Sequence, residues 1–245
     1  MAAEKVAFIT GGNKGLGFET ARQLGQLGVK VVIGSRDLAR GKQAVEKLKA
    51  DGVDAEVVRF DITKPADYKE IYTLLDRKYG RLDILVNNAG VSREDFMGGN
   101  KTSSTSAEVL HETFDTNFFG AVQLTQTLLP LIKKSPAGRI VNLSSILGSL
   151  ALHADPQSPI YNAKAFAYDA SKAALNSFTV HLAHELKDTK IKVNSAHPGW
   201  VKTDMGTDAA PMEIADGAKT SVALATLPDD GPTGAYIHLG ETLPW

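Results

Sequence analysis

The chain has 245 residues, a formal net charge of −1 and no cysteine. A nearly neutral chain lacks the strong field that would hold nucleic acid or an anionic membrane, and the missing cysteines exclude disulfides and thiolate metal sites. The N-terminus has no basic stretch followed by a long apolar core, and no apolar run approaches the roughly 20 residues of a membrane span. We therefore expect a cytoplasmic protein, without nucleic-acid or membrane partners, that forms one domain over residues 1–245.

Short apolar, β-branched runs alternate with amphipathic segments along the chain. The sequence predicts strands over residues 5–10, 30–34, 55–60, 82–87, 138–144, 191–197 and 234–239. It predicts helices over residues 15–28, 38–50, 66–79, 107–133, 160–187 and 213–227, and a surface loop over residues 98–106. Nearly continuous apolar strands are typical of a sheet covered on both faces, and strict alternation favours right-handed crossovers. The predicted fold is α/β, a doubly wound parallel sheet of about seven strands with helices on both faces.

A glycine-rich loop follows the first predicted strand. The stretch TGGNKGLG, residues 10–17, places glycines at Gly11, Gly15 and Gly17 in a variant of the GxGxxG spacing. Glycines allow a tight turn and a close approach to a pyrophosphate, and the N-terminus of the next helix offers free N–H groups and a partial positive charge. Glycines also punctuate ordinary strand–helix turns, but the position after the first strand favours a dinucleotide site.

The end of the second predicted strand indicates which dinucleotide binds. Proteins that bind NAD usually carry Asp or Glu there to hold the ribose hydroxyls, whereas this chain has Ser35 followed by Arg36, with Lys14 in the glycine loop. One neutral residue and two cations suit the 2′-phosphate of NADPH. Alternatively, Arg36 and Lys14 are solvated surface cations and Asp37 is a helix N-cap. The two cations and the missing acid together favour NADPH over NADH.

A set of motifs then occurs in one order along the chain. The set comprises TGGNKGLG (10–17), Asp61, NNAG (87–90), TNFFG (116–120), NLSS (142–145), YDASK (168–172) and HPGWVKTDM (197–205). It resembles the short-chain dehydrogenase/reductase family over essentially the whole chain, and most of all the NADPH-dependent carbonyl reductases. The resemblance implies a Rossmann fold and NADPH-dependent reduction of ketones or aldehydes, which are small-molecule carbonyl substrates, to alcohols.

The resemblance also implies roles for individual residues. The catalytic tetrad would be Asn117, Ser145, Tyr168 and Lys172. The glycine loop would hold the cofactor through Gly11, Asn13, Lys14, Gly15, Leu16 and Gly17. The adenosine half would meet Arg36, Asp61, Ile62, Asn88, Ala89 and Gly90. The nicotinamide half would meet Tyr168, Lys172, Pro198, Gly199, Val201 and Thr203. The substrate would meet Ser145, Tyr168 and Trp200.

Two tyrosines compete for the role of proton donor. Residues three or four apart share one helix face, so both Tyr161 with Lys164 and Tyr168 with Lys172 satisfy the spacing. Tyr168 continues into an uninterrupted amphipathic helix, whereas Tyr161 follows Pro159 at the expected beginning of that helix. The family pattern has four residues from Tyr to Lys, which favours Tyr168 and leaves Tyr161 as a cleft or packing aromatic.

The expected mechanism uses each member of the tetrad. A free tyrosine has a pKa near 10, and a nearby cation such as Lys172 should lower it. Ser145 would stabilise the developing alkoxide, with Ser144 pointing the other way along the strand. Asn117 is a poor helix former inside a long helix. It is either a tolerated polar residue or, as the resemblance implies, a kink that holds a water linking Lys172 to solvent.

The substrate side is less constrained by sequence. The interval from Ser145 to Tyr168 is longer than in many family members, so residues 146–161 are expected to contain an insertion that forms one wall of the cleft. Trp200 is the candidate for a flat apolar wall over the substrate, or alternatively a core or interface residue. Phe96, Met97 and Met205 are further candidate cleft residues. Residues 203–215 are polar and rich in helix breakers and are expected to move as a lid.

The sequence also bears on three other functions. His181, His184 and Glu185 do not have the spacing of an HExxH site, so no metal is expected. No GxSxG motif surrounds the serines at 144–145, which disfavours a serine hydrolase. A catalytically silent dinucleotide-binding sensor or scaffold on the same fold is the alternative function. Family habit suggests a homo-oligomer, a dimer or tetramer, and does not exclude a monomer.

Overall fold

The computed structural model describes residues 4–96 and 99–245. Within these residues the strands form a single sheet in the order β3-β2-β1-β4-β5-β6-β7-β8. The strands are β1 (Val6–Thr10), β2 (Lys30–Ser35), β3 (Ala55–Arg59), β4 (Ile84–Asn87), β5 (Arg139–Leu143), β6 (Lys192–Ala196), β7 (Tyr236–His238) and β8 (Glu241–Thr242). Every pairing is parallel except that of β7 with β8. The predicted doubly wound parallel sheet is therefore confirmed.

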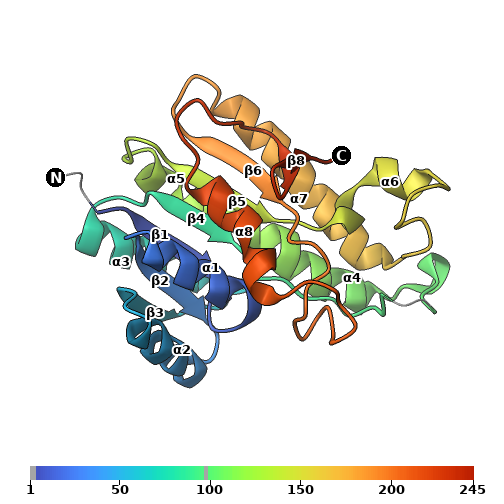
Figure 1. The fold of residues 1–245 in the computed structure, drawn as a ribbon, viewed down its shortest axis with the longest axis horizontal. Helices are drawn as coiled ribbons and strands as arrows, with labels where there is room; N and C mark the ends of the chain where they lie inside the picture. Colours follow the sequence, from blue (N-terminus) through green and yellow to red (C-terminus); the bar gives the residue numbers. More distant parts are fainter. Residues whose placement is uncertain (1–3, 97–98) are drawn as a thin grey trace.

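Helices cover both faces of this sheet (Figure 1). The α-helices are α1 (Gly15–Gln26), α2 (Leu38–Ala50), α3 (Pro65–Tyr79), α4 (Ala107–Phe114), α5 (Gly120–Ile132), α6 (Leu150–Ala154), α7 (Phe166–Glu185) and α8 (Ile214–Ala225). In the part of the chain that is described, no helix is both long and apolar enough to cross a membrane.

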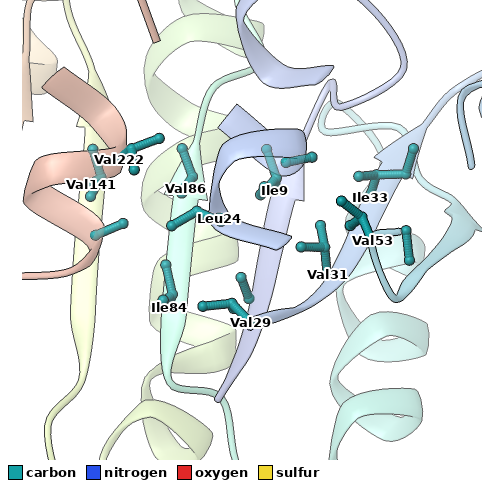
Figure 2. Close-up of a cluster of buried hydrophobic side chains, with 14 of the residues drawn as sticks. Ile9, Leu24, Val29, Val31, Ile33, Val53, Ile84, Val86, Val141 and Val222 are labelled. Atoms are coloured by element: carbon teal, nitrogen blue, oxygen red, sulfur yellow. The ribbon is translucent and has the colours of Figure 1, made fainter. Parts of the chain in front are cut away.

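Alternating strand residues divide the core into two layers. On β1, Ala7 and Ile9 pack with α1, α2 and α8, whereas Val6 and Phe8 pack with α3, α5 and α7. Figure 2 shows the first layer, in which Leu24 of α1 and Val222 of α8 lie over the sheet. Successive strand side chains point to opposite faces, so nearly continuous apolar strands are needed to fill both layers.

The chain order reverses at β1, because β2 and β3 lie on one side of it and β4 to β7 on the other. Open α/β sheets bind ligands at such a point, outside the carboxyl ends of the strands. The loops after β1 and β4, which contain the predicted glycine and NNAG motifs, therefore begin at the same edge of the sheet.

The predicted helix over residues 107–133 is divided into two α-helices. Residues Asp115–Phe119 form a π-helical segment between α4 and α5, and Asn117 is buried inside it. The Asn117 side chain makes two hydrogen bonds with the backbone of Val91. Its Oδ1 accepts from the Val91 N–H at 2.8 Å, and its Nδ2 donates to the Val91 carbonyl at 2.9 Å. A π-bulge of this kind is common at functional sites, and the sequence indicated it only as a kink at Asn117.

Two other predictions were wrong in detail. The helix predicted over residues 160–187 begins at Phe166, because residues 155–163 form successive turns around Pro159. An eighth strand, β8, pairs with β7 across a turn in which Leu239 and Gly240 both have positive φ. A two-residue strand is too short to leave a periodic pattern. The predicted loop 98–106 contains a short 3₁₀ turn, Thr102–Ser104, while Gly98 lies outside the described residues.

Candidate active site

The glycine loop wraps the end of β1 closely against the loop after β4. Gly11 and Gly15 have φ of +64° and +55°, a region that favours glycine. A side-chain carbon on Gly17 would lie 2.4 Å from Asn88 Nδ2 and 2.5 Å from the Gly11 carbonyl oxygen. Asn88 Nδ2 itself donates to the Thr10 carbonyl at 2.8 Å. Gly17 is therefore required by close packing between the two loops.

Gly17→Ala should destabilise the fold and weaken dinucleotide binding together. The added methyl group has no space against the Gly11 backbone, and overpacking of this kind costs about 1–3 kcal/mol. Denaturant unfolding and NADPH fluorescence titration would measure the two effects. Gly90→Ala is the matched control for stability, because its added carbon would lie at an ordinary 3.5 Å from its nearest neighbours. Equal unfolding free energies for the two variants would contradict the steric argument.

The N-terminus of α1 is open toward this loop. Lys14 occupies the N-cap position with an extended backbone and without a capping side-chain hydrogen bond among the described residues. The N–H groups of the first turn are thus available to an anion. The Lys14 ammonium pairs with Asp204, and both side chains are largely exposed. Exposed pairs contribute little to stability, so Lys14 can exchange this partner for a phosphate.

The end of β2 presents no carboxylate toward the same edge. Ser35 is buried and its Oγ donates to the Asp37 carbonyl at 2.7 Å, while Arg36 is exposed. The Asp37 carboxylate accepts hydrogen bonds from the backbone of Ala39 and Arg40 at 2.9 and 3.1 Å. Asp37 is thus the N-cap of α2, as the alternative interpretation stated. Its carboxylate pairs with Arg40 rather than with Arg36.

Ser145 and Tyr168 meet just beyond the end of β5. The Ser145 side chain is close enough to the Tyr168 hydroxyl to act on its pKa, and Ser145 Oγ accepts a hydrogen bond from the backbone of Leu147 at 3.2 Å. Ser144 is also buried, and the opposite direction of its side chain stays a prediction. The predicted partner of the proton donor therefore lies beside it.

Tyr168 and Lys172 share one face of α7. Lys172 Nζ lies 5.6 Å from the centre of the Tyr168 ring and donates to the Leu143 carbonyl at 2.7 Å. Both side chains are buried. Burial lowers the pKa of Lys172 to about 8. This arrangement, one helical turn between a phenol and an ammonium at the carboxyl edge of the sheet, is the one that the spacing predicted.

The expected direction of the Tyr168 pKa shift was wrong. Burial raises the pKa of Tyr168 to about 12, and the neighbouring Ser145 side chain opposes that rise only in part. The physical reason is that the Lys172 ammonium bonds the Leu143 carbonyl, while the phenol is almost completely removed from solvent. Tyr168 consequently keeps its proton throughout the neutral range.

Asn117 lies beside Lys172. A side-chain carbon placed on Gly90 would be 3.5 Å from both Asn117 Oδ1 and Lys172 Nζ, so the two polar groups face one small space between them. Asn117 Nδ2 also donates to Ser171 Oγ at 3.0 Å. The four residues predicted as a tetrad are thus brought together.

The sequence of the chain matches a known family. The family described as short chain dehydrogenase matches residues 5–214. The chain belongs to the short-chain dehydrogenase family.

Individual relatives of this short-chain dehydrogenase are oxidoreductases. Carbonyl reductase [NADPH] 1 of Mus musculus is 33% identical over 282 residues, covering 100% of this chain and 99% of the relative. (+)-Neomenthol dehydrogenase of Capsicum annuum is 32% identical over 304 residues, covering 97% and 96%. Among solved structures, an NADPH-bound carbonyl reductase from chicken fatty liver has a TM-score of 0.84 at 25% identity, with 99% of each chain covered. The chain is therefore an oxidoreductase that resembles carbonyl reductases.

The remaining predicted cofactor residues of this short-chain dehydrogenase lie around the same edge. Asp61 and Ile62 follow β3, where the Asp61 carboxylate accepts from the backbone and hydroxyl of Thr63. Pro198, Gly199, Val201 and Thr203 follow β6, and Gly199 has a φ of +93°. A carbon on Gly15 would lie 3.7 Å from the Thr203 methyl group. The segment after β6 therefore closes over the glycine loop.

The predicted lid is attached at its base. The backbone of Lys202 donates to the Met212 carbonyl at 2.9 Å, and that of Met212 donates to the Trp200 carbonyl at 3.2 Å. Trp200 itself is 49% exposed, and its Nε1 donates to the Gly206 carbonyl at 2.8 Å. Movement of residues 203–215 and a substrate contact of Trp200 stay predictions. Of the other cleft candidates, Met205 is exposed, Phe96 packs on Tyr168, and Met97 lies outside the described residues.

Tyr161 and the polar residues His181, His184 and Glu185 of α7 are exposed, unlike the buried Tyr168 and Lys172. Tyr161 is 39% exposed, and Lys164 Nζ sits 5.1 Å from the centre of its ring while donating to the His153 carbonyl. The helix residues His181, His184 and Glu185 are exposed on α7. Within residues 4–96 and 99–245, no group of three potential metal ligands is found.

Two positions with roles in the site were not identified from the sequence. Thr10 Oγ1 accepts hydrogen bonds from the backbone of Asn88 and Ala89 at 3.0 and 2.9 Å, so it fixes the NNAG loop to the end of β1. A hydroxyl residue immediately before the glycines was the available signal. Glu94, whose carboxylate reaches the backbone of Tyr168, left no signal because the two residues are far apart in sequence.

Proposed function

We propose that this short-chain dehydrogenase reduces ketones and aldehydes to alcohols with NADPH, and that Tyr168 is the general acid. The observation that carries the proposal is the position of Tyr168, which lies beside Ser145 and has the Lys172 ammonium 5.6 Å from its ring centre, one helical turn away. The mouse relative named carbonyl reductase [NADPH] 1 and the NADPH-bound chicken structure support the choice of cofactor and of carbonyl substrates.

The residues at the carboxyl edge of the sheet fit a dinucleotide. The close packing of Gly17 on Asn88 leaves the α1 N-terminus open, and the backbone N–H groups there suit a pyrophosphate. Arg36 and Lys14 suit a 2′-phosphate, since Asp37 is engaged as the cap of α2. NADPH bound here would supply the hydride for the carbonyl carbon.

The side chains of the tetrad provide the rest of the chemistry. Because burial holds the pKa of Tyr168 at about 12, the phenol is protonated at neutral pH and can give its proton to the carbonyl oxygen. Ser145 can donate to the same oxygen as negative charge develops, an effect that is large in a preorganised site. Lys172 and Asn117 face a shared polar space beside Gly90, through which protons can return to Tyr168.

The direct test is NADPH oxidation with a panel of ketones and aldehydes, with chiral analysis of the alcohol product. Turnover that depends on the carbonyl compound would support the proposal. Tight NADPH binding without turnover of any panel member would support the alternative, a dinucleotide-binding sensor.

The double variant Ser35→Asp, Arg36→Ala should shift cofactor preference toward NADH. A carboxylate at the end of β2 repels a 2′-phosphate and accepts hydrogen bonds from free ribose hydroxyls, and the loss of Arg36 removes a charge-assisted bond of about 1.5–3 kcal/mol. We expect the NADPH/NADH ratio of kcat/KM to fall by about 10²-fold. Arg40→Ala, which removes another exposed arginine of the same segment, is the control. An unchanged NADPH/NADH ratio of kcat/KM in the double variant would contradict the proposal that the end of β2 selects NADPH.

A further inference from the structure

The catalytic helix α7 begins without a cap from its own N-cap residue. Ala165 occupies that position and has no side chain able to accept a hydrogen bond. Tyr168 is the third residue of the helix, so its backbone N–H is one of the donors that a helix start leaves unsatisfied. Glu94 Oε2 accepts this N–H at 3.0 Å. The cap of the catalytic helix is therefore supplied by a segment 74 residues away in sequence.

The same segment also contacts the side chain of Tyr168. The Phe96 ring packs edge-on against the Tyr168 ring, with centroids 5.0 Å apart and planes at 80°. Edge-to-face contacts of aromatic rings are favourable and orientation-dependent. Glu94 and Phe96, two residues apart, thus hold the backbone and the ring of one residue at the same time.

The segment that contains Glu94 is hydrogen-bonded to Asn117, a member of the predicted tetrad. Ser92 Oγ accepts from the Glu94 backbone at 3.3 Å and donates to its carbonyl at 3.1 Å. One residue earlier, Val91 exchanges both backbone hydrogen bonds with the Asn117 side chain. Residues 91–96 therefore form a short connection from Asn117 to Tyr168.

A local cap cannot replace this connection. Asp169 Oδ2 accepts the Ala165 N–H at 3.0 Å, but both residues belong to the beginning of α7, so that bond does not connect the helix to the segment after β4. Burial in the first place, and the Glu94 charge in addition, raise the pKa of Asp169 to about 7. The charge of Glu94 therefore acts on the first turn of α7, and its carboxylate accepts a hydrogen bond there. Of the carboxylates of Glu94 and Asp169, that of Glu94 is the one that links α7 to the segment after β4.

We propose that Glu94 is a positioning residue, which fixes Tyr168 in the orientation for proton donation by capping the first turn of α7. A carboxylate at a helix N-terminus also interacts favourably with the helix dipole. The role rests on the proposed function of Tyr168 as the acid. The acceptor oxygen should matter more than the charge, because Glu94 Oε1 is buried without a hydrogen-bond partner among the described residues, and a buried charge in that condition is unfavourable.

The test compares Glu94→Ala with Glu94→Gln, which keeps an acceptor oxygen and removes the charge. We expect Glu94→Ala to lower kcat by about tenfold, as loss of a charge-assisted hydrogen bond implies, with little change in KM and a larger solvent isotope effect on kcat. Glu94→Gln should recover most of kcat. Glu112→Ala is the matched control, because Glu112 is a half-exposed carboxylate that contacts the same segment through Arg93.

Amide hydrogen exchange of Tyr168 gives a readout that does not depend on activity. The exchange rate should rise by about tenfold in Glu94→Ala and stay near wild type in Glu94→Gln and Glu112→Ala. Wild-type kcat and exchange in Glu94→Ala would overturn the role, as would a Glu94→Gln variant as impaired as Glu94→Ala. If Glu94→Ala fails to fold, Glu94→Asp tests the same contact, because its shorter side chain cannot hold the Tyr168 N–H in the same position. Wild-type kcat and amide exchange in that variant would also overturn the role. Absence of turnover in the wild-type protein would instead reject the proposed function. The exchange data would still show whether Glu94 caps the first turn of α7.

Discussion

Tyr168→Phe should lower kcat for carbonyl reduction by about 10²–10⁴-fold, which is the usual contribution of a positioned general acid. The variant removes one hydroxyl and keeps the ring, so the edge contact with Phe96 and the packing of α7 remain. NADPH binding should change by no more than about fivefold, because at most one ordinary hydrogen bond is lost. Steady-state kinetics and NADPH fluorescence titration would separate the two effects.

Tyr161→Phe is the matched control for this variant. Tyr161 has a lysine at similar spacing, and Lys164 Nζ lies 5.1 Å from its ring centre. Its side chain is nevertheless exposed before the helix begins, so loss of the hydroxyl should leave kcat near wild type. Full activity in Tyr168→Phe, or a large loss in Tyr161→Phe, would show that Tyr168 is not the proton donor.

The sequence was sufficient for the topology because that depends on residue type and order. Parallel strands covered on both faces must be apolar almost throughout, and β1 at residues 6–10 and β4 at residues 84–87, each with a single polar residue at its end, show this directly. The motifs then follow the strands at fixed places, which brings Gly17, Asn88 and Ser145 to one edge. None of these steps requires knowledge of a long-range contact.

Details that depend on long-range contacts could not be predicted in this way. The π-helical segment at Asn117 is stabilised by the backbone of Val91, and the start of α7 is capped by Glu94. The predicted direction of the Tyr168 pKa shift was wrong because it too depends on contacts between distant parts of the chain. Sequence spacing gives the distance to Lys172 along the helix, whereas the burial that dominates the pKa comes from segments elsewhere in the chain.

Lys172→Met should abolish most of the activity and also change how stability depends on pH. The loss of the ammonium beside Tyr168 removes a charge from a water-excluded site, and we expect kcat to fall by about 10²-fold. In the folded protein burial lowers the pKa of Lys172 from 10.5 to about 8. A lowered lysine pKa means that folding disfavours the charged form, so the wild-type protein is least stable relative to the variant when Lys172 is charged in both states.

The sign of the pH dependence follows from this difference. Below pH 8, Lys172 is protonated in the folded and unfolded states alike. Between pH 8 and 10.5 the folded protein releases this proton while the unfolded chain keeps it, so wild-type stability rises with pH relative to Lys172→Met. The difference in unfolding free energy should change by roughly 2–3 kcal/mol from pH 7 to pH 10. Denaturant unfolding of both proteins across this range measures it, because every other titrating group cancels in the comparison.

Lys164→Met is the matched control, since Lys164 is an exposed lysine of the neighbouring segment. Because the Lys164 side chain is exposed, the stability difference between this variant and wild type should change much less from pH 7 to pH 10 than that of Lys172→Met. Parallel stability curves for Lys172→Met and wild type would show that the ammonium at residue 172 is solvated rather than buried. In that event Lys172 could not act as a water-excluded charge beside Tyr168, and the chemical argument for this helix face would be lost even if the fold were intact.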